Sequence, residues 1–225
     1  MSEPYNNLKI LFLDFDGVIY TWRADFFRRR SWRAKLHDFL MYKLIYKLPR
    51  SWKWRKHLTS RHHDDQIDHY ALSWLIQLLE DVPDLHIVVS SVWRASGLLY
   101  LKRLLNRHGI DSHRVMSCTP SGDGYRGRDI KMWLEGKEKN PFIPIDSTNR
   151  LEWNDQNPKN TGHCFTAFMA KDENGNVRED SFVIVDDDSD MEPYMHRLVQ
   201  TNGHDGFGHE HYVKIRKLFG VGLPK

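Results

Sequence analysis

The stretch LFLDFDGVIY at residues 11–20 is an apolar run that two aspartates and one glycine interrupt. Buried strands rarely carry carboxylates, because an unpaired ionised group in a dry interior is costly or changes its pKa to escape. Asp14 and Asp16 are two residues apart, so strand alternation directs both side chains to the same side. We therefore expect a buried strand at 8–14 that ends at Asp14, with both carboxylates at its tip or sharing a cation.

Helical and extended patterns alternate along much of the remaining chain. Residues 66–81 carry an apolar stripe with helical spacing, which Asp64 or Asp65 would cap and Pro83 would follow. The other predicted strands are 85–91, 114–118, 181–188 and 197–201, and the other predicted helices are 97–109, 127–136 and 208–219. This alternation predicts an α/β, Rossmann-like fold with a parallel sheet covered by helices on both faces.

Polar residues cluster where three of these strands end. The clusters are Asp14 with Asp16, Ser90 with Ser91, and the run from Asp186 to Asp188. They lie far apart in the sequence, but the carboxyl ends of parallel strands meet at one edge of a sheet, where such folds bind ligands. The sequence therefore predicts one site built from all three clusters.

The bulk composition is typical of a soluble globular protein. The 225 residues are 40% hydrophobic and 28% charged, and the mean hydropathy is −0.63. No apolar stretch approaches the roughly 20 residues that a spanning helix needs. Cys118 and Cys164 match no metal-binding spacing, so we expect reduced packing residues. These features favour a cytoplasmic protein with no membrane partner.

Two long segments interrupt the alternation, and we expect them to be insertions in a core formed by residues 1–20 and 66–225. The first, 21–65, is predicted to be a basic, aromatic-rich helical cap. Residues 21–62 contain 13 Lys and Arg against two acids, which gives them a net charge of +11 and leaves −8 for the rest of the chain. Such a charge split favours a polyanionic partner, although the same aromatic residues would also form the lobe's own small core. The second, 137–180, includes Asn174-Gly175 between extended runs, which predicts a β-hairpin.

The clustered residue types point to phosphoryl transfer. An aspartate can attack phosphorus as a nucleophile, and a second carboxyl group can move the protons. Attack on an anionic phosphate also needs a cation, and Mg²⁺ prefers hard oxygen ligands such as these carboxylates. Gly17 permits a sharp turn that leaves backbone N–H groups open to phosphate.

These residues resemble a known family. DFDGV after an apolar strand resembles motif I of the haloacid dehalogenase-like (HAD) superfamily in its phosphatase form, while VVSS resembles motif II and VIVDDDSDM resembles motif IV. The fuller set of SSVWR, RGRDI, VIVDDDSDM and LVQT is similar to the HAD domains associated with Swiss Army Knife RNA-repair proteins. The resemblance covers residues 8–20, 66–135 and 181–219, and the motifs occur in the order of the family.

The resemblance implies a catalytic and metal-binding set. Asp14 would be the nucleophile and a Mg²⁺ ligand, and Asp16 would be the acid/base with its backbone carbonyl on the metal. Asp187 would be the leading motif IV metal ligand, with Asp186 as the alternative. Further acids, Asp188 and Asp190, would lie in the following turn.

The resemblance also implies a phosphate-binding set. Ser90 would bind phosphate, with Ser91 as the alternative if the register differs by one residue, and both serines could instead cap the next helix. For the basic motif III residue the chain offers Arg126, Arg128 and Lys131. We favour Arg126, while Lys131 keeps the usual chemistry of the family. Arg94 is a further phosphate candidate, unless it pairs with an acid at the sheet edge.

The sequence thus predicts a HAD-type phosphatase that hydrolyses phosphomonoesters with Mg²⁺ through an aspartyl phosphate. The basic segment and the resemblance favour a nucleotide, or a terminal phosphate of RNA or DNA, as the phosphorylated substrate. Two alternatives stay open: a phosphatase for small metabolites, and a nucleic-acid-binding protein that uses the HAD fold as a scaffold.

Overall fold

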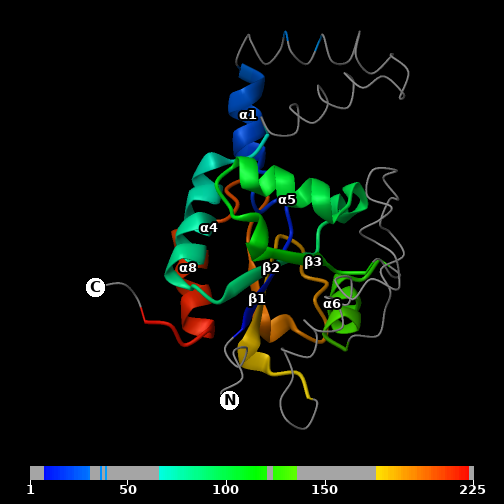
Figure 1. Ribbon diagram of the computed structural model, residues 1–225. Coiled ribbons are helices and arrows are strands. Elements are labelled where there is room, and N and C mark those ends of the chain that lie inside the picture. Colours follow the sequence, from blue (N-terminus) through cyan, green and yellow to red (C-terminus); the bar gives the residue numbers. More distant parts are fainter. Residues whose placement is uncertain are drawn as a thin grey trace.

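The core of the protein is one sheet of five parallel strands (Figure 1). The computed structural model describes residues 8–30, 36, 39, 66–120, 124–135 and 176–222. The strands are β1 (Lys9–Leu13), β2 (Leu85–Val89), β3 (Val115–Cys118), β4 (Phe182–Asp186) and β5 (Leu198–Gln200), in the spatial order β3-β2-β1-β4-β5. The strand order reverses direction between β1 and β4, which makes their carboxyl ends the topological switch point.

Apolar side chains on both faces of the strands bury the sheet between two helical layers. On one face Leu11 and Leu13 belong to a core that also contains side chains of α4 (His69–Asp81), α5 (Leu98–Arg107) and α8 (His209–Leu218). On the other face Ile10 and Phe12 pack with side chains of α6 (Arg126–Glu135). Figure 1 shows α4 and α8 beside each other and α6 on the opposite side of the strands. The predicted Rossmann-like α/β fold with a parallel sheet covered by helices is confirmed.

The element boundaries agree with the expected ones to within a few residues, with informative exceptions. β4 ends at Asp186, two residues before the predicted end, so the next two aspartates lie in the loop. The predicted cap of the helix at 66–81 is wrong: α4 begins at His69, and Asp68 is its N-cap, accepting hydrogen bonds from the backbone N–H groups of Tyr70 and Ala71. A cap must lie directly before the first helical turn, and Asp64 and Asp65 are too early in the chain.

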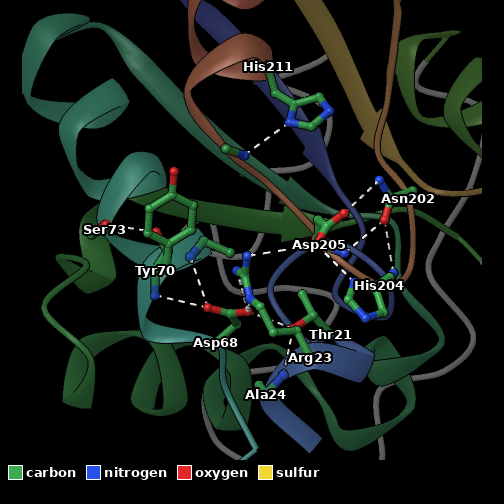
Figure 2. A network of polar contacts seen from close by, with 12 residues as sticks. Thr21, Arg23, Ala24, Asp68, Tyr70, Ser73, Asn202, His204, Asp205 and His211 are labelled. Atoms are coloured by element: carbon green, nitrogen blue, oxygen red, sulfur yellow. Dashed lines mark hydrogen bonds and ion pairs between the residues drawn. The ribbon is translucent and has the colours of Figure 1, made fainter. Parts of the chain in front are cut away.

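Asp68, which lies just after the first predicted insertion, forms hydrogen bonds with residues at the start of that insertion (Figure 2). Thr21 Oγ1 donates to Asp68 Oδ2 at 2.6 Å, and Arg23 donates to the same oxygen through Nη2 at 2.7 Å. Thr21 directly precedes α1 (Trp22–Arg30), which extends away from the sheet in Figure 1. The expected insertion boundaries at 21–65 and 137–180, the cap and the β-hairpin fall mostly outside the described residues and stay predictions.

Two expectations from composition concern the rest of the described chain. Among the described residues, no helix is long and apolar enough to cross a membrane. Cys118 is a buried free thiol, and burial raises its pKa to about 12. It is therefore a packing residue, as expected, whereas Cys164 lies outside the described residues.

Candidate functional site

Asp14 lies directly after β1 and is fully buried, with 0% of its surface exposed. Its backbone N–H donates to the carbonyl of Val185 at 3.0 Å, which continues the β1–β4 ladder by one residue. In the described part of the chain, neither carboxylate oxygen accepts a hydrogen bond of normal geometry. Buried carboxylates are normally hydrogen-bonded, so a carboxylate in this state suits a residue that meets a ligand.

The turn after Asp14 brings a second strand end against it. Gly17 has φ +70°, and a Cβ built on it would lie 2.2 Å from the carboxylate carbon of Asp187. Glycine is therefore required twice, for its left-handed backbone and for the close approach of Asp187. Thr201 Oγ1, after β5, donates to the Gly17 carbonyl at 2.9 Å and holds this turn from a strand that lies beyond β4 in the sheet.

Asp186 is the last residue of β4, the strand next to β1, and it is also fully buried. Its Oδ1 accepts a hydrogen bond from the Asp188 backbone N–H at 3.0 Å. Arg126, the first residue of α6, lies between the two strand ends. Its Nη1 donates to Asp186 Oδ2 at 2.5 Å and forms an ion pair with Asp14 Oδ1 at 2.9 Å. The guanidinium therefore bridges two carboxylates from neighbouring strands.

Three of the predicted acids could together hold a metal ion. Asp14, Asp186 and Asp187 each offer one carboxylate oxygen, and these oxygens lie within 4.8 Å of one another. All three are hard oxygen donors of the kind that Mg²⁺ prefers, and within the described residues neither Asp14 oxygen accepts a hydrogen bond of normal geometry. One guanidinium cannot offset the charge of three carboxylates, so the residues present fit a divalent cation.

The pKa values of these acids report the same shortage of positive charge. Burial raises the pKa of Asp14, and Arg126 opposes that shift only in part. Burial and the charge of Asp14 raise the pKa of Asp186 to about 8. Burial and the neighbouring Asp188 raise the pKa of Asp187. A bound cation would favour the ionised form of all three groups.

The two serines after β2 have different surroundings. The Ser90 hydroxyl is buried and has no hydrogen-bond partner in the described residues. The Ser91 hydroxyl accepts a hydrogen bond from the Trp93 backbone N–H at 3.3 Å and so caps the 3₁₀ helix η2 (Val92–Ser96), and it also acts to lower the pKa of Asp14. Ser91 thus makes the capping contact that the sequence allows for either serine, while the Ser90 hydroxyl has no partner within the described residues.

Two other basic candidates, Arg94 and Lys131, pair with acids outside the group of Asp14, Asp186 and Asp187. Arg94 donates to the Ser90 carbonyl at 2.7 Å and to Asp129 Oδ2 at 2.8 Å, and therefore links the loop after β2 to α6. Lys131 is half exposed, and its Nζ lies 4.0 Å from Glu135 on the same helix. Among Arg94, Arg126 and Lys131, Arg126 alone makes ion pairs with the predicted catalytic and metal-binding acids in the described part of the chain.

Asp16 is exposed, unlike Asp14 and Asp186 of this buried cluster. Its carboxylate accepts a hydrogen bond from the Trp93 indole, with Nε1 3.1 Å from Oδ2 and 3.3 Å from Oδ1. It is not one of the three grouped metal-ligating acids, although its charge contributes to the raised pKa of Asp187. Trp93 had no predicted role, and the only signal for it was its place inside SSVWR.

Asp190, which was predicted only to lie in a turn, and Gly127, which had no predicted role, both position Arg126. Asp190 Oδ2 accepts a hydrogen bond from the Arg126 backbone N–H at 3.2 Å, so the loop after β4 caps the start of α6. A Cβ on Gly127 would lie 2.2 Å from the Glu192 carbonyl oxygen, so only glycine allows the helix to approach this loop. The signal for both was the Arg-Gly pair of RGRDI and the acid-rich loop, which gave no indication that they touch.

The sequence matches a known protein family. The family described as "HAD domain in Swiss Army Knife RNA repair proteins" matches residues 10–170, which is more than half of the chain. The match includes β1, β2, β3 and α6, whereas Asp186 and Asp187 lie beyond its end. Neither the curated proteins nor the solved structures gave a match.

Proposed function

The chain belongs to the family of HAD domains in Swiss Army Knife RNA repair proteins, and from this premise we propose a magnesium-dependent phosphomonoester phosphatase that works through an aspartyl phosphate. Membership supports a HAD-type phosphatase in general. The observation that carries the finer proposal is the buried Asp14 carboxylate, which accepts no hydrogen bond of normal geometry within the described residues and lies within one group of acids with Asp186 and Asp187.

In the first step an Asp14 oxygen attacks phosphorus, the bond from phosphorus to the leaving oxygen breaks, and Asp16 gives that oxygen a proton. In the second step a water oxygen attacks the same phosphorus, the Asp14–phosphorus bond breaks, and the proton of the water passes to Asp16. The second step restores the proton on Asp16 and frees the Asp14 carboxylate, so the enzyme is regenerated. Asp14 is buried and Asp16 exposed, which suits a nucleophile at the phosphate and an acid towards the leaving group.

Asp14, Asp186 and Asp187 would hold the Mg²⁺, with the Asp16 backbone carbonyl as a further ligand. The ion supplies charge neutralisation, which lets an anionic nucleophile approach an anionic phosphate. Arg126 adds a fixed positive charge between Asp14 and Asp186. The Ser90 hydroxyl, buried without a partner in the described residues, is the proposed donor to a phosphate oxygen.

The proposed substrate is a nucleotide or a terminal phosphate of a nucleic acid. Two observations support this choice: the net charge of +11 in residues 21–62, directly after the predicted catalytic aspartates, and the RNA repair proteins in which the family occurs. Basic segments attract polyanions through their phosphates, and such attraction weakens as salt is added.

The test is phosphate release with Mg²⁺ from mononucleotides, 3′- and 5′-phosphorylated oligonucleotides and sugar phosphates. Wild type is compared with Asp14→Asn and with Asp84→Asn, a matched control that changes an exposed aspartate at the amino end of β2. We expect Mg²⁺-dependent release from nucleotides or oligonucleotides in wild type and Asp84→Asn, and none in Asp14→Asn. Release from sugar phosphates alone would contradict the nucleic-acid substrate. Oligonucleotide binding without any release would instead favour a scaffold role.

A further inference from the structure

We propose that Trp93 is a positioning residue whose indole N–H holds the Asp16 carboxyl in the direction of the leaving group. The inference rests on the proposed function, because it assigns Trp93 a part in the proton transfer given to Asp16. Trp93 follows β2 and Asp16 follows β1, so the contact joins two strand ends that are 77 residues apart in sequence.

The geometry of the contact is that of one donor shared by two acceptors. The indole Nε1 lies 3.1 Å from Oδ2 and 3.3 Å from Oδ1, so the N–H points between the two oxygens of the carboxylate. In the described residues no other side chain donates to Asp16. The last torsion of an exposed aspartate is otherwise broad, and a single shared donor restricts it.

The indole is itself held in place from three directions. The Trp93 backbone N–H donates to Ser91 Oγ at 3.3 Å, which fixes the start of η2. The ring packs against Phe15 with centroids 5.8 Å apart and against Tyr20 with centroids 4.5 Å apart. Phe15 and Tyr20 flank Asp16 in the same turn, and Tyr20 is paired with Asp16 through a backbone bridge. The indole donor therefore packs on the same turn that carries its acceptor.

An indole suits this task because of its chemistry. Its N–H only donates and stays neutral, so it neither competes for the proton that Asp16 carries nor adds a charge beside it. A lysine or arginine at the same place would pair with the carboxylate as a salt bridge and favour its ionised form. Trp93 can thus orient the carboxyl without exchanging a proton with it.

A residue that orients the acid matters most when the leaving group needs a proton. The oxygen of 4-nitrophenol leaves readily as an anion, whereas an alkoxide leaves only when it is protonated. Loss of the orienting bond should therefore slow alkyl phosphates selectively, while a general loss of structure should slow both substrates to the same extent.

The experiment compares β-glycerophosphate with 4-nitrophenyl phosphate in Trp93→Phe, which keeps an aromatic ring and removes the N–H. Orientation and acid catalysis together predict that kcat falls roughly 10- to 100-fold for β-glycerophosphate and less than about 3-fold for 4-nitrophenyl phosphate. Trp74→Phe is the matched control, because Trp74 is half-buried on α4 and packs on Tyr212, with ring centroids 5.5 Å apart. It should show no selective loss.

A double-mutant cycle gives the second arm of the test. In an Asp16→Ala background, Trp93→Phe should cause no further selective loss, because the carboxyl that it orients is gone. An equal loss for both substrates, no loss, or a selective loss that persists without Asp16 would each overturn the proposal. If wild type releases no phosphate from any substrate, the proposed function itself fails. If wild type is active but Trp93→Phe causes no selective loss, only the proposal for Trp93 fails.

A further measurement needs neither turnover nor the Trp93→Phe variant, so it stays informative even if that variant misfolds. The indole N–H of Trp93 gives an NMR resonance that a hydrogen bond to a carboxylate moves downfield and protects from exchange with solvent. In Asp16→Ala this resonance should move upfield and exchange faster, while the resonances of the other tryptophans stay in place. An unchanged Trp93 resonance would show that no such bond forms, and would overturn the proposal.

Discussion

Two buried aspartates, Asp14 and Asp68, each lie beside an arginine, but their surroundings differ. Asp68 is the N-cap of α4 and lies beside the start of α1. It accepts hydrogen bonds from Thr21, from Arg23 and from the first turn of α4 (Figure 2). Burial alone would raise the pKa of Asp68, but these donors outweigh it and the net shift is downward. Asp14 accepts no hydrogen bond of normal geometry within the described residues, and its pKa is raised.

The difference separates an acid that holds the structure together from one that is prepared for a ligand. Every oxygen of Asp68 is used, so its charge contributes to the folded state. Burial opposes the charge of Asp14, and Arg126, Ser91 and the Phe15 backbone offset this effect only in part. Such incomplete satisfaction lowers stability, and natural proteins tolerate it mainly where function requires it.

The largest expected effect comes from Asp14→Asn. It should lower phosphatase activity at least about 1000-fold, equivalent to roughly 4 kcal/mol in the barrier, because an amide cannot replace the attacking carboxylate. The metal-free free energy of unfolding, measured with urea, should stay the same or rise, because a poorly satisfied buried charge is removed. A clear loss of stability would show that Asp14 is a structural acid like Asp68.

Adding Mg²⁺ to metal-free protein is expected to give the next largest effect. An ion that binds only the folded state stabilises it by about 2.7 kcal/mol at a hundredfold excess over its Kd. Differential scanning calorimetry should show that Mg²⁺ raises the Tm of wild type. The rise should be much smaller in Asp186→Asn and as large as in wild type in Asp68→Asn. An equal rise in all three proteins would place the ion elsewhere.

Asp68→Ala tests the other half of the comparison. It removes an N-cap and the charged hydrogen bonds from Arg23, and we expect a loss of roughly 2 kcal/mol in the free energy of unfolding. Phosphatase activity per folded molecule should change far less than in Asp14→Asn. Asp111→Ala is the matched control, because Asp111 caps only a short 3₁₀ helix through the His113 N–H, and it should cost less.

The smallest effects are those of pH, and they should have opposite signs for the two acids. The pKa of Asp68 is lowered on folding, so its contribution to stability is present above about pH 4 and lost as the pH falls further. The pKa of Asp14 is raised, so in metal-free protein its ionisation reduces stability as the pH rises from about 4. Urea unfolding across this range should therefore show the gap between wild type and Asp68→Asn narrowing with acid. The gap between Asp14→Asn and wild type should instead widen with rising pH.

Local patterns were enough to predict the sheet and the strand that ends at Asp14. The apolar runs and the helical stripes depend on neighbours a few residues away, so the sequence carries them directly. The error at the start of α4 has a local cause as well. Asp64, Asp65 and Asp68 are all suitable caps by residue type, and only the position of the first helical turn on the sheet selects Asp68.

Residue patterns along the chain were enough to predict the fold class, the family and the position of the predicted catalytic aspartates at a strand tip. The tertiary structure decided which distant groups meet them. Arg126 rather than Lys131 reaches Asp14, because Gly127 lets α6 approach the loop after β4. Trp93 reaches Asp16 because β1 and β2 are neighbours in register. Contacts between distant segments depend on strand order, register and close packing, which no local pattern of residues encodes.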